Sequence, residues 1–268
     1  MLCKHSWDRK KIKSRICKQC GAFAPSSGAK VVREVQYFIP IQDEPEEIVK
    51  ELRIRQRKVN LDNQSYLENR KALVEWIIEL CESYKLRPLT IHLSIYLMDQ
   101  SHSLSKIPKI LYQSIALACI IIICKTEQSE KMPDFQELSQ LTSFNLKSLE
   151  VDILLLVNWK THITTALHFL EFYCSSGFVF DNEVTDSRIC RIAREYAELL
   201  LDLCIAENRF LMVFPEDLAL TCLAVAREKI GLSQPWNNDL KILTGAQLNS
   251  SLYTEILDFY KINFPESY

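Results

Sequence analysis

The chain has 268 residues, of which 48% are hydrophobic and 25% are charged, as is ordinary for a globular protein. It holds only five glycines, and the closest pair, Gly21 and Gly28, are seven residues apart, which excludes the glycine-rich loops that bind phosphate. The net charge of −2 is unevenly spread, because residues 1–20 hold seven basic residues and one acidic residue, leaving −8 on the remainder. A nucleic-acid-binding body is normally basic, so nucleic acid is not expected as its partner.

The cysteines and the apolar stretches indicate the cellular compartment in which the protein is expected. Residues 1–20 lack the apolar stretch of a secretory signal, so no leader is expected there. Cys119, Cys124, Cys204 and Cys222 lie in apolar helical stretches and are expected to be free, buried thiols in a reducing compartment, the nucleus and/or the cytoplasm. The longest apolar run, Ile115–Cys124, is shorter than the roughly 20 residues of a membrane span, so no membrane contact is expected.

The N-terminal quarter divides into two parts. Residues 1–28 form a basic extension that contains cysteine and histidine. Residues 29–62 form a linker with a leading helix, expected at Glu46–Lys58 because Pro45 precedes it, acidic residues begin it and basic residues end it.

Ten further helical stretches are expected, in two groups of five. The first group is Asn69–Tyr84, Pro88–Ser101, Ile107–Lys125, Asp134–Leu141 and a fifth helix capped by Asn145. The second group is Thr164–Ser175, Ser187–Leu203, Pro215–Gly231, Trp236–Leu243 and Gln247–Tyr260. The third helix of the first group is apolar on most faces and should be central. We therefore predict an all-α protein with tandem five-helix domains at 63–162 and 163–268.

The two groups also match in sequence. The stretch Ala116-Leu-Ala-Cys-Ile120 aligns with Ala219-Leu-Thr-Cys-Leu223, 103 residues later, and Thr142-x-x-x-Leu146 aligns with Thr244-x-x-x-Leu248 at a spacing of 102. Two matches at nearly one offset indicate an internal duplication, although chance similarity between helices rich in alanine and leucine is the alternative.

The first group resembles a cyclin box. The stretch Asn69-Arg-Lys-Ala-Leu-Val-Glu-Trp76 is similar to the family's opening motif, and Trp159 matches the aromatic residue that follows its fifth helix. Four of the five signature positions are kept, as Arg70, Asp99, Lys125 and Glu150, whereas Ser114 replaces the usual leucine. The resemblance extends over about Glu44–Tyr260 and is weaker in the second half, where Phe210–Pro215 carries it.

The resemblance implies a regulatory subunit that docks on the αC helix of a cyclin-dependent Ser/Thr kinase and activates it, with no catalytic residues of its own. Lys125 and Glu150 would hold that helix, with Thr126 and Trp159 bordering it; the alternative is that the first two are ordinary solvated helix charges. Arg70 and Asp99 lie at polar positions of two neighbouring helices, where a bidentate ion pair would join them.

The resemblance also implies a substrate-docking groove along the first helix, through which substrates of the kinase would be recruited. Its positions are Asn69, Ala72, Leu73, Trp76, Glu79 and Gln113. Asn69 replaces a methionine of the family and Ala72 a larger aliphatic residue, so we expect a weak or altered groove.

The basic extension carries a candidate zinc site. Cys3, His5, Cys17 and Cys20 supply the four nitrogen and sulfur ligands that structural zinc requires, and Gly21 allows a tight turn after the last cysteine. A basic tail with incidental cysteines is the alternative. A zinc segment before two such folds is also typical of transcription factor IIB, a scaffold that binds DNA or polymerase, but the acidic body of this chain favours the cyclin interpretation.

Overall fold

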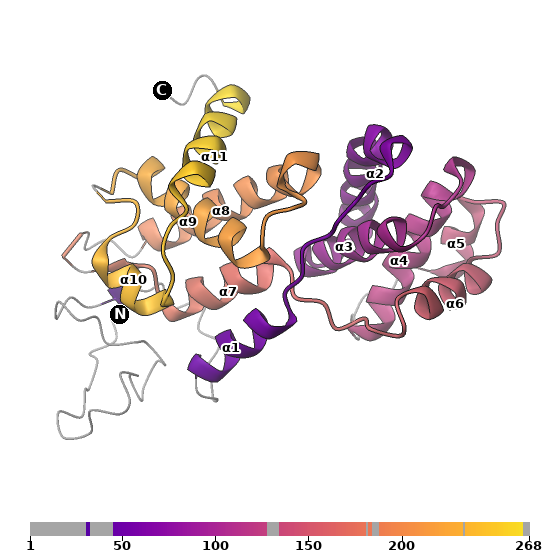
Figure 1. Ribbon diagram of the computed structural model, residues 1–268, viewed down its shortest axis with the longest axis horizontal. Coiled ribbons are helices and arrows are strands. Elements are labelled where there is room, and N and C mark those ends of the chain that lie inside the picture. Colours follow the sequence, from indigo (N-terminus) through magenta and orange to yellow (C-terminus); the bar gives the residue numbers. More distant parts are fainter. Residues whose placement is uncertain are drawn as a thin grey trace. The chain divides into compact units, whose positions relative to one another are not determined.

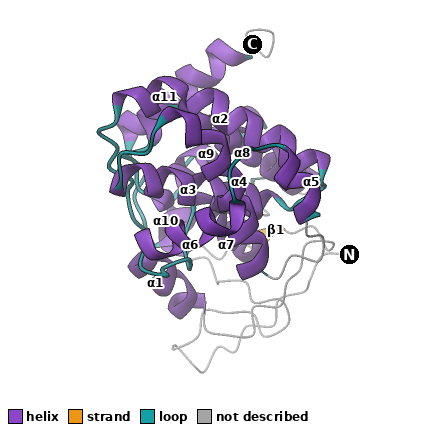
Figure 2. Ribbon diagram, turned by 90° about the vertical axis from the view of Figure 1, so that its right-hand side faces the viewer, coloured by secondary structure: helices purple, strands orange, loops and turns teal. Residues whose placement is uncertain are grey.

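The computed structural model describes residues 31–32, 45–127, 134–180, 182–183, 188–232 and 234–264. Within these ranges helices dominate, and a single two-stranded sheet is present (Figure 2). The chain divides into two compact units. The N-terminal unit comprises Arg55–Thr165 and Leu203–Phe214, and the C-terminal unit comprises Ala166–Asp202, Pro215–Tyr268 and the residues up to Ile54.

The N-terminal unit is built around one buried helix. Its helices are α2 (Gln64–Ser83), α3 (Pro88–Leu104), α4 (Tyr112–Thr126), α5 (Phe135–Gln140) and α6 (Leu146–Leu156), and a 3-10 turn, η2 (Lys109–Leu111), precedes α4. Helix α4 packs against α2, α3 and α6 (Figure 1). Every residue from Ser114 to Cys124 is buried. The stretch Lys109–Thr126 is apolar and long enough to cross a membrane, but 67% of it is buried inside the protein, as expected for a core helix.

The C-terminal unit repeats this order. Its helices are α7 (Ala166–Ser176), α8 (Arg188–Ala206), α9 (Pro215–Lys229), α10 (Asn238–Thr244) and α11 (Ser250–Asn263). The residues of α8 from Leu203 on are counted with the N-terminal unit. Helix α9 occupies the central place that α4 has in the other unit, packing against α7 and α11. The matched segments at Ala116 and Ala219 therefore lie in equivalent buried helices.

Asparagine caps set several helix boundaries. The side chain of Asn145 accepts hydrogen bonds from the backbone N–H groups of Lys147 and Ser148, which confirms the predicted cap of α6. Asn249 caps the last helix of the second group in the same way. Asn63 caps α2, so this helix begins at Gln64 rather than at the predicted Asn69.

A short sheet and a leading helix complete the C-terminal unit. Strand β1 (Val31–Val32) pairs antiparallel with β2 (Val179–Phe180), with Val31 opposite Phe180. Helix α1 (Pro45–Arg55) is held by Arg53, whose Nε and Nη2 donate to the carboxylate of Glu216 on α9, at 2.9 Å and 2.6 Å to Oε1. Arg53 Nη2 also donates to the carbonyl oxygen of Thr244 at 2.7 Å. One arginine thus joins the leading helix to two helices of the second group.

The cysteines that the structure describes are free. Cys119, Cys124, Cys204 and Cys222 are buried, as predicted. Burial raises the pKa of the Cys124 thiol to about 11, so this thiol is protonated at neutral pH and packs as a small apolar group.

Candidate functional site

The candidate site lies where α4 ends beside α6. Lys125 is the last residue but one of α4, and its Nζ forms an ion pair with Oε2 of Glu150 on α6. The two side chains differ in exposure: that of Lys125 is 49% exposed, whereas that of Glu150 is 9% exposed. The structure therefore brings Lys125 and Glu150 together, as a buried carboxylate paired with an ammonium group at the surface.

The carboxylate of Glu150 is not fully satisfied. Its Oε1 atom is buried and has no hydrogen-bond partner among the residues that the structure describes. A buried acceptor without a donor costs on the order of 1–3 kcal/mol. A partner that brings an N–H group to this atom would remove that cost, which makes the position suited to recognition of polar groups.

The two bordering residues differ in what they offer. Thr126 is exposed, and its hydroxyl donates to the carbonyl oxygen of Ile123 at 3.2 Å, within its own helix. Trp159 follows α6 and is 63% exposed. Its φ of 58° and that of Asn158, 53°, place two successive non-glycine residues in the left-handed region, a conformation that costs roughly 1 kcal/mol or more per residue. Strained backbone is often found at ligand-binding and switch sites, so the strain at Trp159 marks it as a candidate contact residue.

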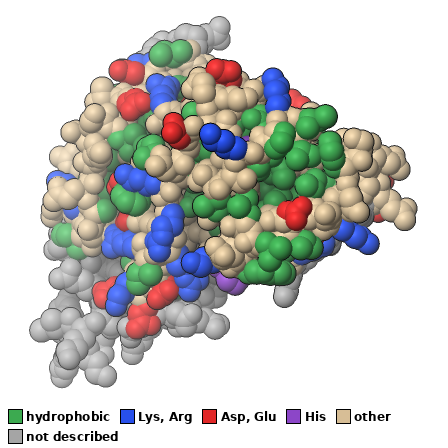
Figure 3. Space-filling view, turned by 45° about the vertical axis from the view of Figure 1, so that its right-hand side comes forward, with side chains coloured by type: hydrophobic (Ala, Val, Ile, Leu, Met, Phe, Trp, Pro, Cys, Tyr) green, Lys and Arg blue, Asp and Glu red, His purple; other side chains and the backbone are tan. Residues whose placement is uncertain are grey.

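An exposed apolar stripe on α6 was missed by sequence reasoning. Val151 and Leu155 are four residues apart, so they share one helix face, and both are exposed. Leu141, before α6, is exposed as well. Figure 3, which brings the side of α2–α6 forward, shows hydrophobic side chains gathered at the surface. The signal was in the sequence, because Leu146–Leu156 holds more apolar positions than a single buried face of a helix requires.

The unusual Ser114 has a polar partner. It is buried on α4, and its hydroxyl shares a hydrogen bond of 2.6 Å with that of Thr142 in the loop before α6. The Thr142 hydroxyl oxygen also accepts from the backbone N–H of Phe144 at 3.1 Å. The serine is therefore satisfied and ties α4 to the loop that leads into the site.

The predicted substrate-docking positions do not all lie at the surface. Ala72, Glu79 and Gln113 are exposed, and Trp76 is half-buried against the core. Asn69 is half-buried, and its side-chain amide donates to the carbonyl oxygen of Ser65 on its own helix at 2.7 Å. Leu73 is a buried residue of the core. These positions offer little apolar surface, and substrate docking along α2 stays a prediction.

The predicted zinc ligands, Cys3, His5, Cys17 and Cys20, lie outside the described residues. Within the described ranges, no group of three or more histidine, cysteine, aspartate or glutamate side chains is arranged to hold a metal ion. The zinc site stays a prediction from sequence.

Comparison with known protein families accounts for both units. The model of the cyclin N-terminal domain matches residues 46–162, and that of the cyclin C-terminal domain matches residues 164–261. The chain belongs to the cyclin family. Cyclin family proteins are regulatory subunits rather than enzymes. The four signature residues form two ion pairs in the cyclin N-terminal domain of this chain: Arg70 pairs with Asp99, with Nε 2.7 Å from Oδ1, and Lys125 pairs with Glu150.

Named cyclins are among the relatives. The chain is 28% identical to Cyclin-B1-1 of Oryza sativa subsp. japonica over 180 residues, covering 66% of this chain and 39% of the relative. It is 28% identical to Cyclin-J of Xenopus laevis over 196 residues, covering 66% and 51%. The chain thus spans about half the length of these cyclins or less.

Solved structures share the cyclin fold. A viral cyclin from herpesvirus saimiri superposes with a TM-score of 0.63 at 20% identity, over 84% of this chain and 98% of that chain. A chain from the yeast RNA Pol II CTD kinase CTDK-1 complex superposes with a TM-score of 0.56 at 15% identity, over 82% and 73%.

Proposed function

We propose that this member of the cyclin family binds a cyclin-dependent Ser/Thr protein kinase by docking on the αC helix of that kinase, and thereby activates it. The observation that carries the proposal is the Lys125–Glu150 pair, in which an exposed cation stands over a buried carboxylate that has an unsatisfied oxygen. Membership of the cyclin family and the relatives named as cyclins support it.

The Lys125–Glu150 pair offers a partner helix one hydrogen-bond donor and one hydrogen-bond acceptor. Nζ of Lys125 can donate to carbonyl oxygens at the C-terminal end of a partner helix, or to an acidic side chain of the partner. Oε1 of Glu150 can accept from an N–H group of the partner while Oε2 keeps its contact with Lys125. Together they fix the direction in which a partner segment lies.

The apolar surface beside the pair supplies contact area. Val151 and Leu155 on α6, and Trp159 after the end of α6, are exposed, and all three follow Glu150 in the chain. Burial of apolar surface is favourable by about 25 cal/mol per Å² before the costs of association are subtracted, so this surface can add to the affinity for a partner. Interfaces of this kind combine aromatic anchors with a few oriented charges.

Activation follows from differential contact. A kinase is active when a glutamate of its αC helix pairs with the lysine that positions the ATP phosphates. A surface that fits αC only in this orientation binds the active conformation more tightly and raises its population. The cyclin chain contributes no catalytic group in this scheme, and its residues act by orienting the kinase.

The experiment is affinity purification of the chain with identification of the kinases it retains. In a Lys125→Ala/Glu150→Ala variant we expect kinase recovery to fall by at least about tenfold, because removing charged partners from an interface costs about 2–5 kcal/mol. The matched control is Lys261→Ala/Asp258→Ala, which removes a surface ion pair of α11 and should leave recovery unchanged. Kinase recovery that is equal in the two double variants, with helical content preserved, would reject this site.

A further inference from the structure

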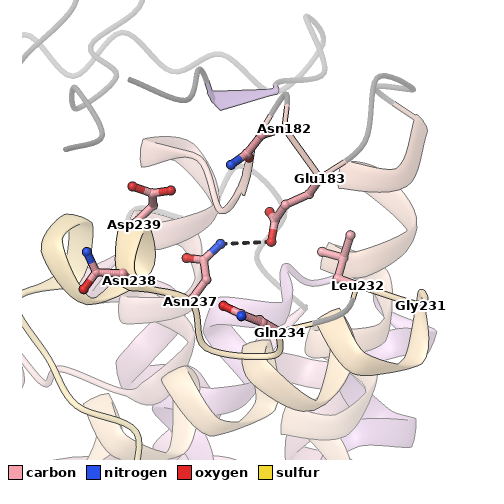
Figure 4. Close-up of a pocket in the computed structure, with 8 residues that line it drawn as sticks. All are labelled: Asn182, Glu183, Gly231, Leu232, Gln234, Asn237, Asn238 and Asp239. Carbon is pink, nitrogen blue, oxygen red and sulfur yellow. Dashed lines mark hydrogen bonds between the residues drawn. The ribbon is translucent and has the colours of Figure 1, made fainter. Parts of the chain in front are cut away.

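The C-terminal unit holds a polar cavity of about 460 Å³, which is lined by Glu183 in the turn after β2 (Figure 4). The carboxylate of Glu183 is already paired within the protein. Its Oε1 accepts from Nδ2 of Asn237 at 2.9 Å, the bond drawn in Figure 4, and from Nη2 of the buried Arg227 at 2.5 Å. These bonds join the turn after β2 to α9 and to the start of α10, so the role of this carboxylate is structural.

Exposed apolar side chains occur in the N-terminal unit, in the connection between α3 and α4 (residues 104–111). Leu104 ends α3 and is 52% exposed, and Ile110 in η2 is 75% exposed. Ile107 and Leu111 are half-buried and pack against the core of the N-terminal unit. The inward pair therefore holds the connection in place, while the outward pair faces solvent. Single exposed apolar residues are common on proteins, but two in one short connection indicate a contact surface.

Local hydrogen bonds fix the backbone of this connection. The N–H of Ser105 donates to the carbonyl oxygen of Ser101 at 3.1 Å, and the N–H of Leu111 donates to that of Pro108 at 2.9 Å. The ring of Pro108, with a φ of −63°, also restricts the backbone where the chain enters η2. A surface that is already ordered loses little conformational entropy when it binds a partner.

The same connection carries two unpaired cations. Lys106 and Lys109 are exposed, and residues 100–126 contain no aspartate or glutamate. Neither lysine side chain forms an ion pair or a hydrogen bond with any residue that the structure describes. Other lysines of this unit are paired, as Lys71 is with Glu207. The connection thus combines exposed apolar side chains with positive charge that is not neutralised locally, and this favours a partner that is both apolar and negatively charged.

The charge of the rest of the chain indicates which kind of anionic partner fits. Residues 21–268 carry a net charge of −8, since the whole chain carries −2 and residues 1–20 carry +6. A membrane surface or a nucleic acid presents an extended array of negative charge, which this acidic body would repel. A short peptide segment contacts only the connection and avoids that repulsion.

We propose that the connection of residues 104–111 docks a short peptide segment of a partner protein that carries both apolar and acidic side chains. Leu104 and Ile110 contact the apolar side chains of that segment, and Lys106 and Lys109 pair with its carboxylates. Six residues of chain span at most about 20 Å, so an extended segment of similar length can reach both apolar residues. Docking here requires neither a bound kinase nor the α4–α6 surface.

The test measures peptide binding to the full chain without a kinase, so its outcome is separate from that of the proposed function. The probes are three fluorescein-labelled peptides in which two leucines flank two, three or four aspartates, between Gly-Ser and Ser-Gly ends. Each has a matched control with asparagine in place of aspartate. We expect at least one aspartate peptide to bind at least about tenfold more tightly than its control, with an affinity that falls as salt is added.

Two results of this experiment would overturn the proposal. One is equal binding of aspartate and asparagine peptides in every pair, or no binding of any peptide up to about 1 mM protein. The other is binding of the chain to vesicles of equal amounts of phosphatidylcholine and phosphatidylserine in place of the peptides, since the occupant would then be a membrane surface.

An apolar variant and a matched control locate the binding. Ile110→Ser should weaken binding of the tightest peptide at least about fivefold, because it removes an apolar contact. Ile262→Ser changes an apolar side chain of α11 that is 76% exposed, and it should leave binding within about twofold. Both side chains are exposed, so a folding defect is not expected. Equal affinities of the two variants would place the peptide elsewhere and reject the site.

The charges are tested in the same way. Lys106→Gln/Lys109→Gln should weaken peptide binding at least about tenfold. Lys160→Gln/Lys241→Gln, an equal change of charge at exposed positions of other segments, should leave binding within about twofold. If the two double variants bind the peptide equally, the lysines of the connection do not receive its carboxylates and the proposal fails.

Discussion

Arg70 on α2 and Asp99 on α3 form a bidentate ion pair, with Nε 2.7 Å from Oδ1 and Nη2 2.8 Å from Oδ2, and both side chains are buried. The same guanidinium group donates to the carbonyl oxygens of Ile205 and Ala206 at the end of α8, at 2.8 Å and 3.3 Å. Desolvation alone would lower the pKa of Arg70, but the adjacent Asp99 carboxylate outweighs it and the pKa is raised. One permanently charged side chain therefore joins three helices.

Replacing this arginine should be among the most damaging single changes. Arg70→Ala leaves the carboxylate of Asp99 buried without its cation, so we expect the free energy of unfolding to fall by about 3–5 kcal/mol. The matched control is Lys71→Ala, which removes the neighbouring but exposed ion pair with Glu207 and should cost less than about 1 kcal/mol. Urea denaturation of both variants measures the difference; similar losses in the two would contradict the role assigned to Arg70.

His102 should make stability depend on pH. It is buried on α3, its ring stacks on Tyr66 at 3.7 Å between centroids, and Nδ1 lies 2.9 Å from the carbonyl oxygen of Met98. Burial lowers its pKa despite the opposing effects of that carbonyl and of nearby Asp99, so the folded protein favours the neutral ring. As the pH falls below about 6.5, His102 is protonated in the unfolded chain before it is protonated in the folded protein. The free energy of unfolding therefore decreases progressively below this pH.

The measurement is the free energy of unfolding between pH 7.5 and pH 5 in the wild-type chain and in His102→Phe, which keeps an aromatic ring against Tyr66. The wild-type chain should lose stability toward acid with a slope approaching about 1.4 kcal/mol per pH unit more than the variant. Parallel pH profiles for the two proteins would show that His102 does not titrate differently on folding.

Trp159 should separate stability from binding. Its φ of 58° is unfavourable for any residue with a Cβ, and its side chain is mostly exposed. Trp159→Gly should therefore be more stable than Trp159→Ala by about 1 kcal/mol, because glycine adopts this conformation without strain. Both variants should lose kinase affinity to the same extent, since both remove the aromatic contact. A kinase affinity that survives in either variant would remove Trp159 from the proposed interface.

Zinc binding by the N-terminal extension remains open to a direct test. If Cys3, His5, Cys17 and Cys20 form a site, the purified chain should carry about one zinc ion, and a Cys17→Ser/Cys20→Ser variant should lose it. Cys174→Ser, which changes a half-buried free thiol of the C-terminal unit, should retain the metal. Elemental analysis measures the zinc content of each protein. Equal zinc content in the wild type and the double variant would contradict the predicted site.

The helical architecture could be predicted because local patterns determine it. Apolar periodicity, prolines at helix starts and asparagine caps predicted ten helices of the two groups, and the structure has a helix at each of these places. The predicted helix boundaries were less accurate where a capping side chain or a tertiary contact determines the end of a helix. The leading helix ends at Arg55 rather than Lys58, and α4 is preceded by the separate turn η2 after Pro108. The β1–β2 pair escaped prediction because each strand has only two residues and its partner is remote in sequence.

The candidate site was predictable only in part. Lys125 and Glu150 were identified through the cyclin resemblance, since 25 residues separate them and no local rule joins them. The exposed faces of Val151 and Leu155 were not predicted, because an apolar helix does not reveal from sequence which side lacks a neighbour. The cavity beside Glu183 was also missed, because the pairing of Glu183 with Arg227 arises only when the turn after β2 meets α9.

The most direct test of the central claim is the activity of the kinase that co-purifies with the chain, measured on a peptide substrate with and without added cyclin. The account predicts that the wild-type chain raises kcat/KM by up to about a hundredfold, if about 1% of the free kinase is in the active conformation. It predicts that Lys125→Ala/Glu150→Ala leaves kcat/KM near the value of the free kinase. Equal activation by the wild-type and double-variant chains, or binding of the wild-type chain without any rise in activity, would contradict it.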